Sequence, residues 1–310
     1  MPQNRHRKAG GPRPAPGVAA VGAADFAITA ATNRATRSAT RVATEGTISV
    51  APAVERSIPR LARLPRPVYA RMESLPAGSL ARPHTHAWVQ LSYAISGVLE
   101  IRTATASFVA PPQRAIWIPA GIEHEVRTSA RTEMRSLYLD SAATAWAPAD
   151  CHVLAVSPLV RELILAVGAL SVEYDEAGPA GRLVATLFDQ LAALPQVAFN
   201  LPLPRDARLL KVCSALQAAP DDTRSLATWG EVAGLGERSL ARLFRAETGL
   251  SFGDWRLRLR LLLALGALER GERVTRVALD CGYASTSAFI AAFRRAFGST
   301  PLAMFGRGAG

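Results

Sequence analysis

The feature that most constrains this chain is a short pattern that occurs twice in its last hundred residues. Leu243-Phe244-Arg245 with Gly249 returns as Ala292-Phe293-Arg294 with Gly298, an offset of 49 residues. Each phenylalanine has an apolar residue four positions earlier, Leu240 and Phe289, as one face of a helix requires. Two copies are too few for a solenoid, so the pattern predicts two helix-turn-helix units.

The residues around the repeat favour helices throughout 205–310. We expect them at 205–218, 225–233, 237–247, 252–269, 274–281 and 286–297. Glycines occupy both expected turns, and Ser285 is a suitable N-cap for the last of these helices. The helix at 252–269 would be about 27 Å long, which approaches the ~34 Å between successive major grooves of DNA.

Three segments of this region resemble the signatures of the AraC/XylS family of transcription regulators. They are FRAETGLSF at 244–252, VALDCGYASTSAF at 277–289 and FRRAFGSTP at 293–301, and the resemblance covers about residues 205–306. It implies promoter DNA as the partner, with RNA polymerase as a further contact. It also implies base-reading positions at Arg238, Ala241 and Arg242 in the first motif, and at Thr286, Ser287, Ile290 and Ala291 in the second.

The arginines divide unequally between the two motifs. Arg245 in the first motif can reach bases or phosphates, and Arg294 and Arg295 in the second suit phosphates. Position 291 is often Arg or Gln in the family and is Ala here, so the second motif lacks a long side chain for bidentate base contacts. We therefore expect sequence discrimination to depend mainly on Arg238 and Arg242.

Residues 65–140 contain short strand patterns separated by turn signals. Strands are expected at 89–95, 98–103, 107–110, 115–118, 123–127 and 135–139, with Ser96-Gly97 as a tight hairpin turn. The predicted fold is therefore α+β. It consists of a cupin-like antiparallel β-barrel over 61–145, a helical hairpin over 146–195, and an all-α tandem helix-turn-helix domain over 205–310.

Histidines in this strand-rich segment form a recognisable pattern. His84-Thr85-His86 with Gln90 four residues on, and Pro119-Ala120-Gly121-Ile122-Glu123-His124, resemble the two motifs of the cupin family. The resemblance implies ligands that meet inside the barrel, and residues two apart on a strand point the same way. Gln90 stands at the family's carboxylate position, and an amide oxygen is a weaker, neutral ligand.

Three interpretations of this cluster stay open. His84, His86 and His124, with or without Gln90, could hold a divalent transition metal such as Ni, Zn or Fe. The same side chains could hydrogen-bond an organic effector without metal, or they could form a polar cluster in a packed barrel. Trp88, Tyr93 and Trp117 could line the site, although aromatic residues at this spacing are more often core residues.

The remaining segments connect or flank these regions. The hairpin at 146–195 resembles those through which sensor domains dimerise, so we expect a homodimer. Residues 196–204 are the expected linker, since 195–204 contains three prolines. Residues 1–60 carry one aromatic residue and no periodicity, which predicts a disordered basic segment.

Charge and cysteine content restrict partners and compartment. The net charge is +11, with +6 in residues 1–60, −1 in 61–204 and +6 in 205–310, so a polyanionic partner is expected for at least one end. The three cysteines are far apart, which suggests neither disulfides nor a zinc knuckle. No segment is long and apolar enough for a membrane span, and we expect a cytoplasmic protein.

These observations together predict a sequence-specific DNA-binding transcription regulator that responds to a small effector or metal in the barrel. The alternative from another class is a metal-dependent cupin enzyme with an accessory helical domain. Gln90 in place of a carboxylate, together with the tandem motif, argues against that alternative. We therefore expect no enzymatic activity.

Overall fold

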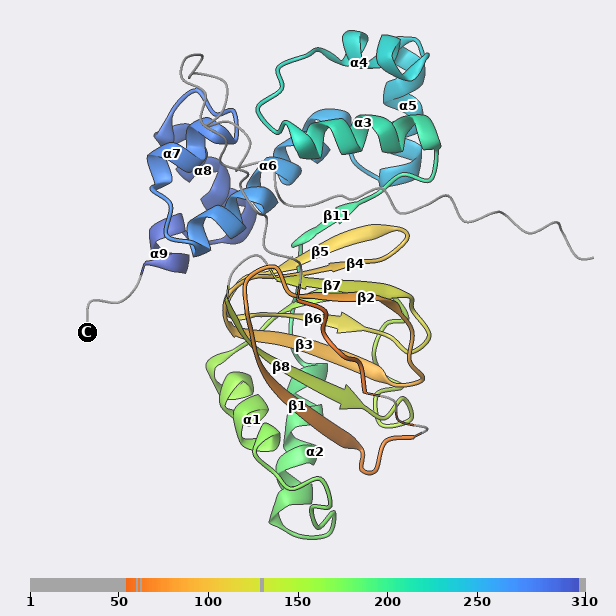
Figure 1. Ribbon diagram of the computed structural model, residues 1–310, viewed down its shortest axis with the longest axis vertical. Helices are drawn as coiled ribbons and strands as arrows, with labels where there is room; N and C mark the ends of the chain where they lie inside the picture. Colours follow the sequence, from red (N-terminus) through yellow and green to blue (C-terminus); the bar gives the residue numbers. More distant parts are fainter. Residues whose placement is uncertain (1–53, 60, 62, 129–130, 307–310) are drawn as a thin grey trace, which may run out of the picture.

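A computed structural model describes residues 54–306, apart from residues 60, 62, 129 and 130. Two antiparallel sheets with two helices form the sheet region (residues 54–202), and helices form the helical region (residues 207–305), so the predicted α+β class is confirmed (Figure 1). Most of the segment expected to be disordered, residues 1–53 and 60, lies outside the described residues.

The first sheet has six strands. Their order is β1 (Val68–Leu75), β8 (Thr132–Leu139), β3 (Val89–Ser96), β6 (Arg114–Ile118), β9 (His152–Ala155) and β10 (Gln196–Val197). On β3, Leu91 and Tyr93 belong to the core on the helical side, whereas Ala94 belongs to the core on the other side. This alternation follows from the two-residue period of a strand.

The second sheet has five strands. Their order is β11 (Asn200–Pro202), β5 (Ala106–Ala110), β4 (Leu99–Arg102), β7 (His124–Thr128) and β2 (Leu80–His84). The described strands thus form two separate sheets, where the sequence predicted one barrel. Strands β1, β2, β9, β10 and β11 were not predicted individually, because their pairings join residues far apart in the chain.

Helices α1 (Pro158–Gly168) and α2 (Pro179–Ala192) form the predicted hairpin and cover the outer face of the six-stranded sheet (Figure 1). Ser157 caps α1 by accepting a hydrogen bond from the Val160 N–H, and Pro158 follows at the first helical position. Tyr93 and Trp117 are buried in the core between this sheet and the two helices. They are core residues, not lining residues of the histidine cluster.

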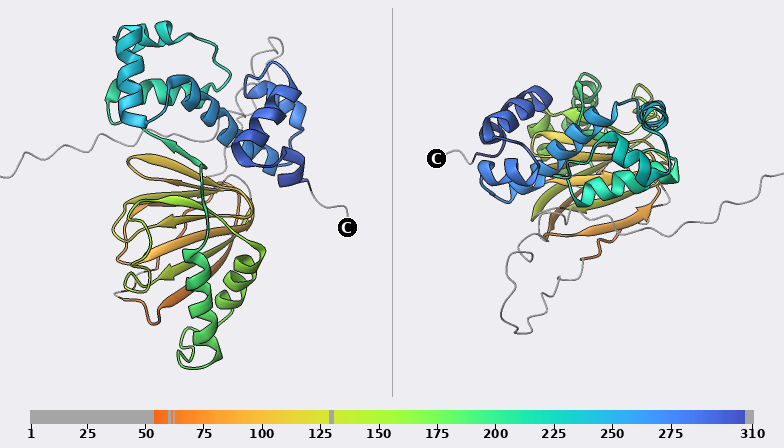
Figure 2. Two further views of the ribbon diagram at one scale, coloured as in Figure 1. Left: turned by 180° about the vertical axis from the view of Figure 1, so that it is seen from behind. Right: turned by 90° about the horizontal axis from the view of Figure 1, so that it is seen from above.

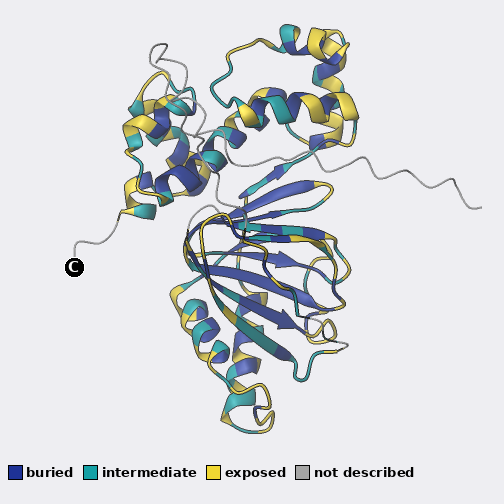
Figure 3. Cartoon of the chain, in the orientation of Figure 1, coloured by how far each residue is buried: buried dark blue, intermediate teal, exposed yellow. Residues whose placement is uncertain are grey.

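The helical region contains seven helices within the described residues. They are α3 (Ala207–Ala218), α4 (Leu226–Ala233), α5 (Glu237–Thr248), α6 (Phe252–Glu269), α7 (Val274–Asp280), α8 (Thr286–Phe297) and α9 (Pro301–Phe305). Only α9 was not predicted. Figure 2 shows α6 between the two helix-turn-helix units, and Figure 3 shows that the helices here have both buried and exposed faces.

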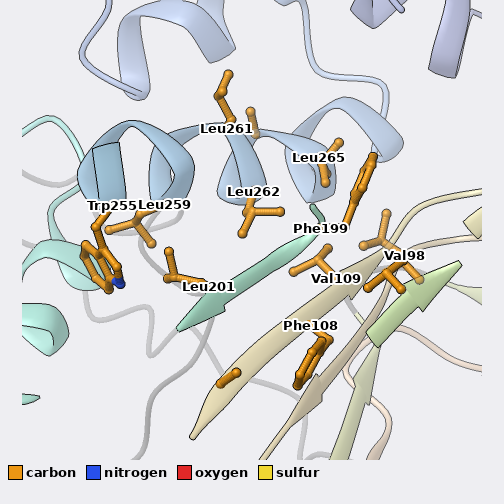
Figure 4. Close-up of a cluster of buried hydrophobic side chains, with 14 of the residues drawn as sticks. Val98, Phe108, Val109, Phe199, Leu201, Trp255, Leu259, Leu261, Leu262 and Leu265 are labelled. Carbon is orange, nitrogen blue, oxygen red and sulfur yellow. The ribbon is translucent and has the colours of Figure 1, made fainter. Parts of the chain in front are cut away.

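Residues 196–204, expected to be a linker, contain strands β10 and β11 instead. β10 pairs with β9 and β11 pairs with β5, so this segment completes both sheets. Helix α6 packs on it: the indole N–H of Trp255 donates to the carbonyl of Pro202 at 2.7 Å. Figure 4 shows Leu262 and Leu265 of α6 above Val109 and Phe199 of the sheet region. The buried core therefore continues from one region into the other.

Within the described residues, no helix combines the length and the apolar character that crossing a membrane demands.

Candidate nucleic-acid interface and histidine cluster

The first helix-turn-helix unit consists of α4, a tight turn and α5. Gly234 ends α4 in the left-handed conformation with φ of 65°, which glycine adopts without steric cost. Gly230 lies against the turn, where an added Cβ would come within 2.7 Å of the Leu235 carbonyl oxygen. Both glycines therefore allow α4 and α5 to pack closely at a fixed angle.

Helix α5 buries one face and exposes its arginines. Leu240 and Phe244 are fully buried in the core. Arg238, Arg242 and Arg245 are exposed, and no hydrogen bond or ion pair holds their side chains among the residues that the structure describes. Ala241 is half-buried between them. Three cationic groups therefore extend from one helix without a partner in the described part of the chain, as a surface for a polyanion needs.

The second unit consists of α7, a turn at Gly282 and α8. The Ser285 hydroxyl accepts a hydrogen bond from the Ala288 N–H and caps α8, as predicted. The face of α8 that carries Ser287, Ile290, Ala291, Arg294 and Arg295 borders a shallow open hollow of about 620 Å³, with Thr300 at its edge. Thr286 lies at the start of the same helix and is half-buried.

The two helices differ in chemistry, as the sequence suggested. The positions of α8 that face outward in the middle of the helix are small or apolar, and its arginines lie in the last turn. Helix α5 has arginines near its start, its middle and its end. Long donors that can reach base edges are therefore concentrated on α5.

The three predicted histidines meet between the two sheets. His84 at the end of β2 is directly opposite His124 at the start of β7, and their ring centroids are 4.2 Å apart. His86 follows β2, with its ring centroid 5.0 Å from that of His124. One ring nitrogen of each histidine lies within 4.8 Å of the others.

Backbone carbonyls orient all three imidazole rings. Nδ1 of His84 faces the Arg82 carbonyl at 2.7 Å, Nδ1 of His86 faces the Trp88 carbonyl at 2.7 Å, and Nδ1 of His124 faces the Ile122 carbonyl at 2.9 Å. A carbonyl can only accept, so each neutral ring carries its proton on Nδ1 and a lone pair on Nε2. Histidines that bind a metal through one ring nitrogen commonly donate the N–H of the other to a backbone carbonyl, which orients the ring.

Burial keeps these rings neutral. It lowers the pKa of His84 and of His86, and it lowers the pKa of His124 to about 3. The Nε2 atom of His124 is buried and has no hydrogen-bond partner among the described residues. An unsatisfied buried acceptor is costly, so this nitrogen requires a donor or a cation from outside the chain.

Gln90 joins the cluster from the opposite sheet. Its amide nitrogen donates to the Ser92 hydroxyl at 2.8 Å, and its Oε1 lies 3.0 Å from Nε2 of His86. Because Nε2 of neutral His86 has no proton, two lone pairs face each other here. A cation would satisfy both, and otherwise the amide must turn over to offer its NH₂ group. Three imidazole nitrogens and an amide oxygen therefore fit a divalent transition metal.

Two family models match the chain over the two regions. Residues 70–203 match an AraC-like ligand binding domain, and residues 229–307 match a helix-turn-helix domain. The chain is 36% identical over 218 residues to the HTH-type transcriptional regulator NimR of Escherichia coli, which covers 70% of this chain and 80% of that protein. The chain belongs to the AraC-type transcription regulators.

One further relative and one solved structure are also similar to the chain. The HTH-type transcriptional regulator RipA of Corynebacterium diphtheriae is 36% identical over 118 residues, which is 38% of this chain and 33% of that protein. ToxT from Vibrio cholerae has a TM-score of 0.34 and 12% identity, and the match covers 77% of this chain and 98% of that one. The family confirms the predicted DNA-binding regulator with a ligand-binding domain.

In this AraC-type regulator, the cluster has several aromatic and charged neighbours, of which the sequence indicated only Trp88. Trp88 stacks on His86 with centroids 5.2 Å apart, and Tyr138 approaches the His86 ring edge-on at 6.1 Å. Arg56 and Glu73 form a buried ion pair nearby. Tyr138 and Glu73 were missed because the sequence analysis did not assign which side chains of their strands point inward. Arg56 was missed because it lies in the segment expected to be disordered and its partners are distant in sequence.

Proposed function

We propose that this regulator responds to a divalent transition metal, Ni²⁺, Zn²⁺ or Fe²⁺, held by His84, His86 and His124. The observation that carries the proposal is the convergence of three neutral imidazoles whose other nitrogens all face backbone carbonyls. Gln90 would supply a fourth, neutral ligand. When bound, the metal would supply a positive centre that fixes β2, β7 and β3 relative to one another.

A chain of paired strands offers a route from the cluster to the DNA-binding helices. His124 lies on β7, which pairs with β4; β4 pairs with β5, and β5 pairs with β11. Strand β11 contacts α6, which lies between the two units. A ligand alters DNA binding only if it favours one arrangement of these regions over another.

We propose that the two reading helices have different tasks. Arg238, Arg242 and Arg245, around Ala241 on α5, would read bases and reach phosphates. Thr286, Ser287, Ile290 and Ala291 on α8 would contribute van der Waals contacts with thymine methyl groups, and Arg294 and Arg295 would bind phosphates. The five arginines are exposed, and this division is supported by their positions, along the whole of α5 but only in the last turn of α8.

The partners and compartment follow from the same proposal. We propose a homodimer formed through α1 and α2, contact with RNA polymerase at the promoter, and a cytoplasmic location. A role without catalysis is supported by the names of the relatives and by Gln90, which lacks the charge that would strengthen metal activation of water.

The second candidate is an organic effector that binds these side chains without metal. It is favoured by the contact between His86 and Gln90, which satisfies both groups once the amide turns over. Under this alternative, a donor group of the effector would satisfy Nε2 of His124.

Metal analysis of the purified full-length protein distinguishes the two candidates. Wild type, His84→Ala and His152→Ala are each dialysed against Ni²⁺, Zn²⁺ or Fe²⁺ and then against buffer. His152 is a matched control, since its Nδ1 also faces a backbone carbonyl but its ring lies against Trp117, outside the cluster. We expect bound metal in wild type and His152→Ala and its loss in His84→Ala. Equal, negligible metal in all three would contradict the metal proposal.

A further inference from the structure

We infer that the site beside the histidines takes a small organic anion, whose acid group is received by Arg56 and Arg71. This inference rests on the proposed function only in treating the histidine cluster as the effector site. It names the charge and class of the effector, and it applies whether or not a metal is bound. The evidence is the excess of positive charge beside the cluster and a buried donor, the Trp88 indole N–H, that has no hydrogen-bond partner among the described residues.

Arg56 is carried into the sheet region by the strap (residues 54–59). The Arg56 N–H donates to the Leu80 carbonyl at 2.8 Å, and the Leu80 N–H donates to the Val54 carbonyl at 3.0 Å, so the strap runs along the edge of β2. Arg71 of β1 donates to the Ser57 carbonyl at 2.6 Å and ties the strap from the other side. The Arg56 side chain is only 5% exposed.

Two guanidinium groups share a single carboxylate here. Arg56 contacts Oε2 of Glu73, and Arg71 contacts Oε1 of the same residue at 2.9 Å. With the three histidines neutral, these groups leave one positive charge in excess. A divalent cation at the histidines would raise that excess to about three, and charge taken out of water needs a counter-charge. An anionic ligand supplies it.

Trp88 contributes a buried donor next to the cluster, since its indole N–H has no hydrogen-bond partner among the described residues. Trp88 stacks on His86 and meets Tyr138 edge-on, and Tyr138 stacks on Tyr69 at 6.0 Å. An indole N–H and guanidinium groups need an acceptor-rich ligand, and the aromatic rings suit a planar one.

Polar side chains lie one after another between the arginine and the histidines. Arg56 donates to the Ser136 hydroxyl at 3.2 Å, and Ser136 is paired with Ser92 across β8 and β3. Ser92 accepts from Gln90, which contacts His86. Arg56 and the histidines therefore belong to one site.

Calorimetric titration of the full-length protein with benzoate and with benzamide tests the inference. The two probes have almost the same shape and differ in charge. We expect wild type to bind benzoate at least about 10-fold more tightly than benzamide, with or without Ni²⁺, because a guanidinium–carboxylate pair in a partly dehydrated site is worth about that factor. Equal affinities, or no binding of benzoate at millimolar concentration, would overturn the inference.

Variants with opposite expected effects separate loss of charge from loss of folding. Arg56→Gln should bring the benzoate-to-benzamide ratio toward one, whereas Glu73→Gln frees both arginines and should increase it. Arg82→Gln is the control, because Arg82 pairs with Glu55 of the strap but its side chain is 71% exposed. It should leave the ratio unchanged. A ratio that falls equally in all three variants, or is unaffected by Arg56→Gln, would contradict the assignment.

These outcomes are independent of the metal proposal. A protein that binds no metal but prefers benzoate would retain the inference and reject the metal. A protein that binds metal through His84 but does not distinguish benzoate from benzamide would retain the metal proposal and reject the inference of an anionic effector.

Discussion

The ring of Phe199 stacks on the ring of Phe297, with centroids 4.5 Å apart and planes 27° from parallel. Phe199 lies between β10 and β11 in the sheet region, and Phe297 is the last residue of α8. The guanidinium group of Arg114 also lies over the Phe199 ring, 5.2 Å from its centroid. One aromatic side chain thus joins the end of a reading helix to the strands of the effector-binding region.

Phe199→Ala should uncouple the two regions. Phe199 is 1% exposed, so removing its ring leaves a cavity at the junction and should lower the free energy of unfolding by about 3–5 kcal/mol. Unfolding in guanidinium chloride, followed by tryptophan fluorescence, measures this loss, since Trp88, Trp117 and Trp146 report on the sheet region and Trp229 and Trp255 on the helical region. Phe199→Leu should cost less. Unchanged stability in Phe199→Ala would show that the stack does not join the regions.

Replacing the two groups of arginines should affect DNA binding differently. Arg238→Ala with Arg242→Ala should reduce discrimination between specific and random DNA by about 1–3 kcal/mol per contact. Arg294→Ala with Arg295→Ala should weaken both kinds of binding alike and reduce the salt slope by about two. Gel-shift titrations at several salt concentrations measure both effects.

Arg82→Ala is the control for this comparison, because the Arg82 side chain is 71% exposed on β2, outside both reading helices and outside helices α1 and α2 of the proposed dimer. Loss of discrimination in the α8 pair rather than the α5 pair would reverse the assignment.

The buried thiols make stability sensitive to alkaline pH. Burial, with the charges of Asp150 and Asp280 as second causes, raises the pKa of Cys151 and of Cys281 to about 12. Burial also raises the pKa of Cys213. In the unfolded chain a thiol loses its proton above about pH 8.5, whereas the folded thiols keep theirs. The free energy of unfolding should therefore fall as the pH rises beyond that value.

The rate of alkylation reports directly on the raised pKa and the burial of these thiols. With a pKa of about 12, roughly one thiol in 10,000 is ionised at pH 8, so iodoacetamide should label the native protein slowly and the denatured protein completely. Mass spectrometry counts the labels. Rapid labelling of Cys213 or Cys281 in the native protein would contradict their burial.

Local signals explain what the sequence predicted correctly. Helices α6 and α8 have the predicted bounds, because Ser251 and Ser285 cap their starts. The meeting of His84 with His86 and His124 followed from a motif resemblance and from strand geometry. The unequal chemistry of α5 and α8 could likewise be read from residue types alone.

Long-range pairing explains what was missed. Pro83 weakened the strand pattern of β2, whose position depends on β7 about 40 residues later. The prolines of 196–204 indicated a linker, but this segment pairs with β9 and β5. Arg56 contacts Glu73 and Ser136, which are 17 and 80 residues away. Single-sequence patterns carry no information about such contacts.

The central claim is that occupancy of the histidine cluster alters DNA binding. Fluorescence anisotropy with the gene's own upstream DNA tests it most directly, using wild type, His84→Ala and His152→Ala, each with and without Ni²⁺, Zn²⁺ or Fe²⁺. We predict that one of these metals changes the apparent Kd of wild type and His152→Ala by about 5–150-fold, the usual range of allosteric coupling, and leaves that of His84→Ala unchanged. Identical wild-type affinities with and without every metal would contradict the account.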